Sequence, residues 1–269
     1  MKKFLILFTA AMVISLIACG NKNKQEMNSN MERQEVSVSP IQSKKMIPSD
    51  VYSTGTDSVY VTLVGHGSLM FEYKGKMMYI DPYSAVADYT KLPKADLILL
   101  THEHGDHLDV NAIDAIKKED THFIVSKICN EQLGYGDVMS NGDKTQWENV
   151  KIEAVPAYNI VNKKPNGEHY HPKGRGNGYI LTFDSLRIYV GADTENIPEM
   201  DKLKNTIDIA FLPKNLPYTM TDEMFIDAAK KVSPKYLYPY HFSEFNEAKI
   251  SKALEGTNIR LVIRPMKNN

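Results

Sequence analysis

The sequence predicts an α+β fold of the αββα type, a four-layer sandwich in which two mixed β-sheets pack face to face between outer helices. Three features indicate this fold. Short segments rich in β-branched and aromatic residues show the alternation of half-buried strands. Wholly apolar runs, typical of strands buried on both faces, alternate with amphipathic helical segments. The second half of the chain repeats this order, so we expect two sheets, each covered by its own helices.

The first half of the predicted domain begins near residue 57. The sequence Tyr-Lys-Gly-Lys at 73–76 is typical of a turn that joins two antiparallel strands. A short apolar run then predicts a buried strand, and Asp109 is the predicted N-cap of the helix behind it. The predicted strand segments are 58–65, 68–83, 95–100 and 121–126, and the helix is 109–119.

The second half contains the same kinds of element in the same order. A strand precedes a hairpin, and buried strands then alternate with helices up to the end of the chain. We expect one folded domain over 57–269. Its second-half elements are predicted at 150–158, 176–194, 207–213, 221–232, 235–242 and 260–265, with a final helix before the last strand.

The N-terminus reads as an export signal rather than as part of the fold. Two lysines precede the 15 largely apolar residues from Phe4 to Ala18, which are fewer than the roughly 20 that a membrane span needs. Small residues before Cys19 resemble the bacterial lipoprotein box. We therefore expect a signal peptide at 1–18, lipidation of Cys19, and a polar, flexible tether over 19–56. The mature protein would be exported and anchored to a bacterial membrane.

Composition narrows the remaining classes of function. The chain has 269 residues, of which 24% are charged, and its net charge of −1 gives no basic surface for nucleic acid. The two cysteines, Cys19 and Cys129, do not form a disulfide framework. Cys129 lies in a predicted amphipathic helix, where we expect a buried free thiol.

The segment "LLTHEHGDHLD", residues 99–109, carries the densest chemistry of the chain. His102 and His104 are two residues apart behind a buried strand, so in an extended segment both imidazoles point the same way. Asp106 and His107 follow where the chain bends back, and they can address a second point nearby. Imidazole and carboxylate are ligands for Zn²⁺, Fe²⁺ and similar ions. The pattern predicts two metal half-sites within six residues.

This motif resembles the signature of the metallo-β-lactamase-fold superfamily, and the resemblance extends from about Val59 to Pro265. It implies roles for three further residues that each end a strand. Asp81, in "YIDPY", corresponds to a buried aspartate that supports the metal ligands from behind. Asp193, in "VGADTE", corresponds to an aspartate that bridges two ions, and His241, in "YPYHF", to the last histidine ligand.

The resemblance also implies a third histidine for the first metal, between the two halves. His171 stands in "HPKGRGNGY", which looks like the pattern of one group of small hydrolases in this superfamily. His169 lies in the same interval, and Asn159 is nearer the end of a strand, where this ligand usually lies. We expect His171, with His169 and Asn159 as alternatives.

His66, in "VGHGSLMFEYKG", resembles a position in two branches of the superfamily. These are the ascorbate-6-phosphate lactonase-like proteins and the N-acyl-phosphatidylethanolamine phospholipase D-like proteins. Both branches share the His-Leu-Asp ending of the motif. His66 is therefore a candidate catalytic residue that contacts substrate or a bound water, although capping a strand is an equal alternative.

Together these residues predict a metal-dependent hydrolase with two divalent ions. We expect Zn²⁺, with Mn²⁺ and Fe²⁺ as alternatives, because the ligand types select weakly among them. A hydroxide held between the ions, oriented by Asp106, would attack an ester, lactone, phosphoester or amide bond of a small-molecule or lipid-like substrate. Lys214, Asn215 and Tyr218, in "LPKNLPYTMTDE", are candidate substrate contacts. The alternatives are a surface lipoprotein with a non-catalytic metal site and a di-iron redox protein of the same fold.

Overall fold

The computed structural model describes residues 47–266. The predicted signal peptide, Cys19 and the tether up to residue 46 lie outside the described residues. The chain divides into the units Met1–Lys44 and Lys45–Asn269, and the described residues belong to the second. Over the described range, every helix is too short or too polar to cross a membrane.

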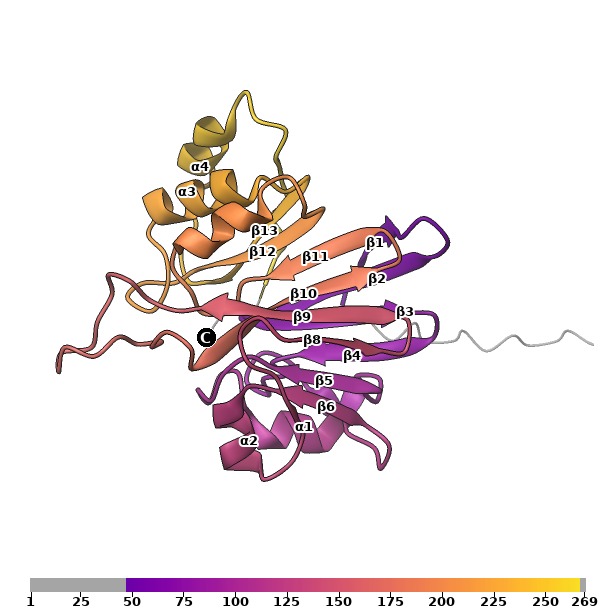
Figure 1. Ribbon diagram of the computed structural model, residues 1–269. Coiled ribbons are helices and arrows are strands. Elements are labelled where there is room, and N and C mark those ends of the chain that lie inside the picture. Colours follow the sequence, from indigo (N-terminus) through magenta and orange to yellow (C-terminus); the bar gives the residue numbers. More distant parts are fainter. Residues whose placement is uncertain (1–46, 267–269) are drawn as a thin grey trace, which may run out of the picture. The chain divides into compact units, whose positions relative to one another are not determined.

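Residues 47–266 form two seven-stranded sheets, one from each half (Figure 1). The first sheet contains β1 (Asp50–Ser53), β2 (Ser58–Gly65), β3 (Ser68–Tyr73), β4 (Lys76–Ile80), β5 (Leu97–Leu100), β6 (His122–Val125) and β7 (Asp137–Val138). The second contains β8 (Lys144–Trp147), β9 (Val150–Ala157), β10 (Gly176–Phe183), β11 (Leu186–Val190), β12 (Ile209–Lys214), β13 (Tyr236–Phe242) and β14 (Arg260–Leu261).

The two sheets have the same topology. In each, the first four strands pair antiparallel and the last four pair parallel, so β4 and β11 begin the parallel part of their sheets. Parallel strands need crossover connections, and helices occupy those connections. The first-half elements are η1 (Tyr89–Lys91), α1 (Val110–Ile116) and α2 (Lys127–Leu133), and the second-half elements are η2 (Pro198–Leu203), α3 (Asp222–Val232) and α4 (Glu247–Leu254).

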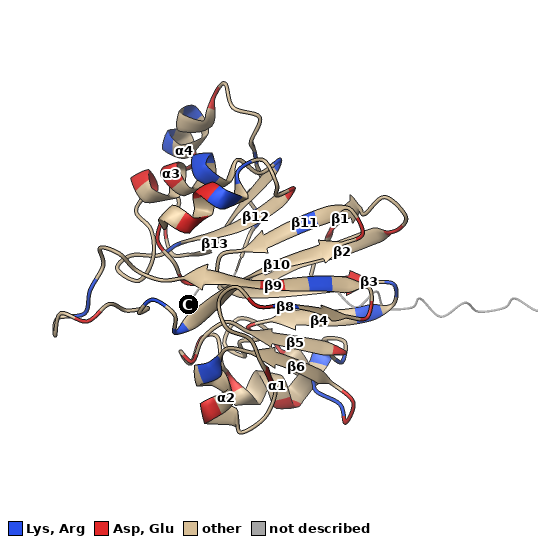
Figure 2. Cartoon of the chain, viewed as in Figure 1, with Lys and Arg blue, Asp and Glu red and all other residues tan. Residues whose placement is uncertain are grey.

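Three apolar clusters separate four layers, which confirms the predicted αββα sandwich. The central cluster joins the facing sides of both sheets, where the ring of Phe71 lies 6.1 Å from that of Phe183. A second cluster lies under α3 and α4, and a third lies under α1 and α2. In Figure 2, positions coloured for Lys, Arg, Asp and Glu are frequent on the outer helices and in the loops, while the strands are largely tan.

Local sequence signals account for the helix boundaries and for the buried thiol. The Asp109 carboxylate accepts hydrogen bonds from the backbone N–H groups of Asn111 and Ala112, which confirms it as the N-cap of α1. Cys129 is buried in α2 and makes no disulfide, as predicted. Burial raises the pKa of its thiol to about 12.

The predicted boundary at residue 57 was too late, because β1 lies within the segment assigned to the tether. β1 pairs antiparallel with β2, and Asp50 is tied to the end of the chain. Its carboxylate accepts hydrogen bonds from Arg264 Nε at 2.9 Å and from Tyr238 Oη at 2.8 Å. The four residues of β1, Asp-Val-Tyr-Ser, are too few to show a clear strand pattern, and the contacts that fix Asp50 come from distant segments.

Candidate metal centre and active-site cleft

The predicted metal-site residues gather where strands of both sheets end. Asp81 follows β4, and the histidine-rich motif follows β5. In the second sheet, Asp193 follows β11 and His241 lies near the end of β13. The carboxyl ends of parallel strands meet at one edge of a sheet, and here the edges of two sheets meet. The backbone N–H of Asn177 bonds to the carbonyl of Thr101 at 3.0 Å and joins the sheets at this edge.

Several of these strand ends adopt a left-handed backbone conformation. The φ angles are +49° at His66, +47° at Asp81, +56° at Ala192 and +48° at His241. A left-handed conformation costs a non-glycine residue roughly 1–2 kcal/mol. Such residues concentrate where the surrounding structure imposes a functional geometry. The sharp turns direct the side chains at these strand ends toward the centre rather than along the sheet.

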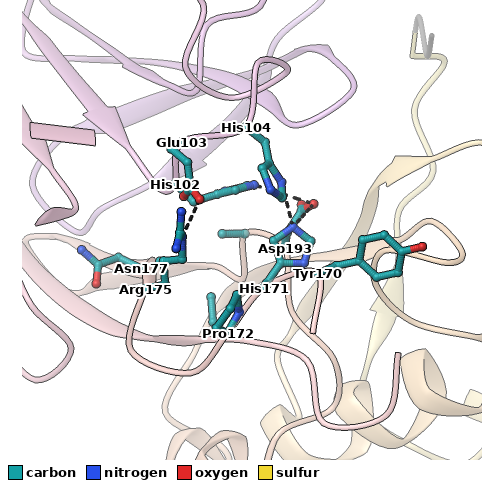
Figure 3. A pocket seen from close by; sticks show the side chains of 12 residues that line it. His102, Glu103, His104, Tyr170, His171, Pro172, Arg175, Asn177 and Asp193 are labelled. Carbon is teal, nitrogen blue, oxygen red and sulfur yellow. Dashed lines mark hydrogen bonds and ion pairs between the residues drawn. The ribbon is translucent and has the colours of Figure 1, made fainter. Parts of the chain in front are cut away.

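His102, His104 and His171 form the first cluster, with ligand atoms within 4.8 Å of one another. Nε2 of His171 lies 3.2 Å from Nδ1 of His104 (Figure 3). Nε2 of His102 is buried and has no hydrogen-bond partner. Three imidazole nitrogens therefore face one point.

The structure brings His171 into this cluster, and it places the two alternatives elsewhere. His169 lies in the β9–β10 loop, where its Nδ1 is 3.1 Å from the carbonyl oxygen of Asn162. Asn159 lies behind His171, and its Oδ1 is 2.8 Å from His171 Nδ1, the nitrogen that faces away from the cluster.

His66, Asp106, His107 and His241 form the second cluster, again with ligand atoms within 4.8 Å. Nε2 of His241 is 3.1 Å from Nε2 of His107 and 3.5 Å from Oδ2 of Asp106. Oδ2 of Asp106 also lies 2.9 Å from Nε2 of His66. This carboxylate joins the loop behind β5 to the β2–β3 turn.

Asp193 lies between the two clusters and presents one oxygen to each. Its Oδ1 is 3.4 Å from Nε2 of His107 and 3.4 Å from Nε2 of His241. Its Oδ2 is 3.2 Å from Nε2 of His171 and 4.0 Å from Nε2 of His102. One carboxylate therefore faces both clusters.

Asp81 holds the histidine-rich motif from behind. Its Oδ2 is 2.8 Å from His107 Nδ1 and accepts a hydrogen bond from the Thr101 hydroxyl at 2.6 Å. Its Oδ1 accepts from the Thr101 N–H at 2.8 Å. A carboxylate on Nδ1 leaves Nε2 of His107 directed at the second cluster, as in many metal-binding histidines.

The pKa shifts indicate strong electrostatic coupling between the carboxylates and the imidazoles of the second cluster. Although burial opposes ionisation of Asp106 and Asp193, the imidazoles around them hold the pKa of each carboxyl far below its usual range. Burial also opposes charging of His107, yet Asp193, Asp106 and Asp81 raise its pKa to about 10. The carboxylates thus favour a positive charge at this position, which a divalent cation supplies in place of a proton.

The donor set fits divalent metal ions. Burial holds the pKa of His102 well below its usual value and also lowers that of His104, so both imidazoles remain neutral and keep a lone pair for a ligand. Oδ1 of Asp193 and Nε2 of His102 are buried without hydrogen-bond partners. A buried polar atom left unpaired costs roughly 1–3 kcal/mol, which coordination of an ion would remove.

A cleft of about 710 Å³ opens over the second cluster and Asp193. This volume is within the range of small-molecule sites. Asn215 and Tyr218 line it, as predicted, together with Tyr83, Lys164 and Tyr170, which sequence reasoning missed. Tyr83 follows Asp81 by two residues and could have been found from that spacing. The other two lie in a loop without periodicity.

Lys214 was wrongly assigned to the cleft. Its ammonium group lies 3.0 Å from Oδ1 of Asp222 at the start of α3 and donates a hydrogen bond to the Glu244 carbonyl at 2.8 Å. It is not among the residues that line the cleft, whereas Asn215, the next residue, is.

A family model described as the beta-lactamase superfamily domain matches residues 60–241. The chain belongs to the β-lactamase superfamily. A relative named UPF0173 metal-dependent hydrolase, from Flavobacterium johnsoniae, is 30% identical over an alignment of 207 residues. The match covers 71% of this chain and 88% of that protein. A relative of the same name from Geobacillus sp. is 30% identical over 69% of this chain and 86% of its own length.

A solved structure extends the likeness. A protein from Parabacteroides distasonis, named provisionally as a metal-dependent hydrolase, is 47% identical and superposes with a TM-score of 0.78. The match covers 82% of this chain and 100% of that one. The predicted metallo-β-lactamase fold is confirmed, and the chain is a metal-dependent hydrolase of that superfamily.

Proposed function

We propose that the protein is a binuclear hydrolase whose two clusters each hold one divalent ion, with Zn²⁺ as the expected metal. The observation that carries the proposal is the position of Asp193, whose two oxygens face separate histidine clusters. His102, His104 and His171 would hold one ion, and Asp106, His107 and His241 the other. Bound ions would supply a water of lowered pKa and polarise the oxygen of the substrate.

The chain's own residues then orient the reaction. The depressed pKa of Asp106 keeps it a carboxylate, so it acts as a ligand and as an acceptor that aligns the attacking water, not as an acid. Burial lowers the pKa of His66, which favours the neutral imidazole. A neutral His66 donates its Nε2–H to Asp106 Oδ2 and thereby holds that carboxylate in place.

The cleft supports a small-molecule or lipid-like substrate with an ester, lactone, phosphoester or amide bond. Tyr83, Tyr170 and Tyr218 give it apolar walls with hydroxyl tips, and Lys164 and Asn215 add polar contacts. The resemblance of Gly65-His66 and of His107-Leu108-Asp109 to the lactonase-like and phospholipase D-like branches supports the same range.

Metal analysis with a substrate panel tests the proposal. Purified protein should contain close to two ions per chain and hydrolyse at least one of a phosphodiester, a lactone and an amide. Two ions without turnover of any substrate would favour a non-catalytic metal site. Iron with reversible oxidation would favour a di-iron redox protein.

Replacement of Asp193 tests the bridge itself. Asp193→Asn keeps the shape but removes the charge that offsets two neighbouring cations. We expect weakened binding of one or both ions and a loss of kcat of at least about 100-fold, on the order of 3 kcal/mol. Asp81 contacts His107 only at Nδ1, the nitrogen that faces away from the cluster, so Asp81→Asn should lower kcat by about 10–100-fold. Metal content by mass spectrometry and kcat are the measurements. Two ions and near-normal kcat in Asp193→Asn would overturn the bridge.

We also propose that the protein is exported and lipid-anchored through Cys19. The apolar run that ends at Cys19 supports this location. Cys19→Ala should release the protein from membranes or leave the signal peptide attached, as measured by fractionation and by mass spectrometry of the N-terminus. Cys129→Ala is the matched control and should leave the lipid in place. Persistent lipid on Cys19→Ala would exclude the assignment.

A further inference from the structure

The Asn159 side chain occupies a buried position directly behind His171. Its Oδ1 accepts a hydrogen bond from the backbone N–H of His171 at 2.7 Å and lies 2.8 Å from Nδ1 of the same residue. The opposite ring nitrogen, Nε2, is the one that faces His104 and Asp193. Because an amide oxygen only accepts hydrogen bonds, Oδ1 of Asn159 favours a protonated Nδ1 on His171.

Two acceptors on the other side of Asn159 determine which way its amide points. Nδ2 lies 2.8 Å from the carbonyl oxygen of Tyr218 and 3.1 Å from Oε1 of Glu195. Both partners only accept hydrogen bonds, so the amide nitrogen must face them and the amide oxygen must face His171. A flipped amide would place a donor against the His171 backbone N–H and oxygen against two acceptors.

Glu195, which orients the Asn159 amide, is itself held by the backbone. It is 0% exposed, and its carboxylate accepts hydrogen bonds at 2.7 Å from each of the backbone N–H groups of Ile160, Val161 and Asn162. Among the described residues it has no cationic partner within ion-pair distance. Four N–H donors, one of them from Asn159, therefore surround a buried carboxylate.

We propose that Asn159 and Glu195 are positioning residues that fix the tautomer of His171. The chain of contacts runs from Glu195, an acceptor, to the Asn159 amide, and from the amide oxygen to a protonated Nδ1 of His171. Nε2 is then left with its lone pair directed at the first cluster. This inference rests on the proposed role of His171 as a metal ligand. Metal-binding histidines generally need such a partner on the second nitrogen.

The same two side chains also hold the rim of the cleft. Glu195 binds the backbone of 160–162, and Asn159 binds the carbonyl of Tyr218, which lines the cleft. A displacement of the rim would therefore move the Asn159 amide and, with it, the hydrogen bonds that this amide makes to His171.

Glu195→Gln is the sharpest test, because it alters one atom far from the ions. The carboxamide nitrogen must face either the N–H groups of Ile160 and Val161, or the N–H of Asn162 together with the Asn159 amide. If it faces Asn159, that amide flips, its nitrogen meets His171 Nδ1, and the proton moves to Nε2. We expect ¹⁵N NMR of the metal-free variant at pH 8 to show an unprotonated Nδ1 on His171. The metal-free wild type should show a protonated one.

Zinc affinity supplies the second readout. Chelator competition should show one of the two Zn²⁺ ions held about 10–100-fold less tightly in Asn159→Ala and in Glu195→Gln. His171→Ala removes the proposed ligand itself, so its loss of zinc affinity is the maximum against which the other variants are compared. Asn162→Ala is the matched control: it removes an amide of the same loop, which bonds to the Thr219 carbonyl and touches neither Asn159 nor His171. It should leave the affinity and the His171 proton unchanged.

A paired substitution separates positioning from simple loss of structure. In Asn159→Asp with Glu195→Gln, the new carboxylate accepts from His171 and the new amide donates to that carboxylate. The His171 Nδ1 proton and the zinc affinity should return to within about threefold of wild type, even if the protein is less stable. Unchanged Nδ1 protonation and zinc affinity in both Asn159→Ala and Glu195→Gln would overturn the inference. The NMR readout in metal-free protein is independent of whether any substrate is hydrolysed.

Discussion

Gly67 lies against the imidazoles of His107 and His241 in the second cluster. The two imidazoles are stacked, with centroids 5.1 Å apart and planes inclined by 13°. A Cβ at Gly67 would stand 2.9 Å from Cε1 of His107 and 3.3 Å from Cδ2 of His241. The absence of a side chain is therefore a condition for the geometry of the second cluster.

Gly67→Ala should separate these two ligands. We expect one ion to be bound at least about tenfold more weakly, and a loss of about 1–3 kcal/mol in the free energy of unfolding, typical of overpacking. Zinc titration and denaturant unfolding are the measurements. Gly105→Ala is the control, because a Cβ there meets no atom within 4 Å. Equal zinc affinity in both variants would show that His107 and His241 can move apart without weakening the metal site.

Asp96 joins three elements of the first half at the end opposite the metal centre. Its carboxylate accepts hydrogen bonds from the N–H of Met77 in β4 at 2.8 Å and from Nζ of Lys118, beyond α1, at 2.6 Å. Although burial opposes ionisation, these contacts lower the pKa of the Asp96 carboxyl. The ionised carboxylate therefore stabilises the entry into β5.

The lowered pKa sets the pH range of this stabilisation. A depressed folded-state pKa gives stability that is present above the unfolded value, about 3.9, and is lost as pH falls through the folded value. Asp96→Asn should lower the free energy of unfolding by about 1.5 kcal/mol at pH 7. The difference from wild type should shrink below pH 4. Asp114→Asn, in an exposed pair with Lys117, should have little effect. Urea unfolding across pH tests both, and a pH-independent difference would contradict this account.

At the scale of the folded domain, each cluster draws its donors from both sheets. The motif behind β5 supplies His102, His104, Asp106 and His107, and the second half supplies His171, Asp193 and His241. Bound ions would therefore link the two halves at one edge, beyond the apolar contact between the sheets. Binding to the native state alone adds stability by mass action.

Removal of metal should consequently destabilise the whole domain. An ion present at 100 times its Kd adds about 2.7 kcal/mol, and for a domain of this size each kcal/mol corresponds to about 2–4 °C. Chelation should lower Tm by roughly 5–10 °C, as measured by calorimetry. Zn²⁺ should restore Tm, whereas Mg²⁺, which prefers oxygen ligands, should not. Identical Tm values with and without metal would contradict the link between the halves.

The features that local rules control were predictable. The buried run before His102, the turn at Lys74-Gly75 and the cap at Asp109 each depend on neighbours within a few residues. The positions of Asp81, Asp193 and His241 at strand ends were also visible, because each follows an apolar run. Lys214 was misplaced because its ammonium group pairs with Asp222 and with the Glu244 carbonyl, contacts that the local sequence does not reveal.

The sequence by itself determined the αββα sandwich, the histidine-rich motif and the kind of ion it suits, because periodicity and ligand chemistry act locally. Only the tertiary structure shows that His171, and not His169 or Asn159, lies with His102 and His104. These residues lie in a loop without periodicity, and its backbone is held by Glu195, 36 residues beyond Asn159. The same reason applies to β1, whose Asp50 meets Arg264 across 214 residues. Contacts between distant segments leave no local pattern, since the free energy that selects them appears only when the sheets come together.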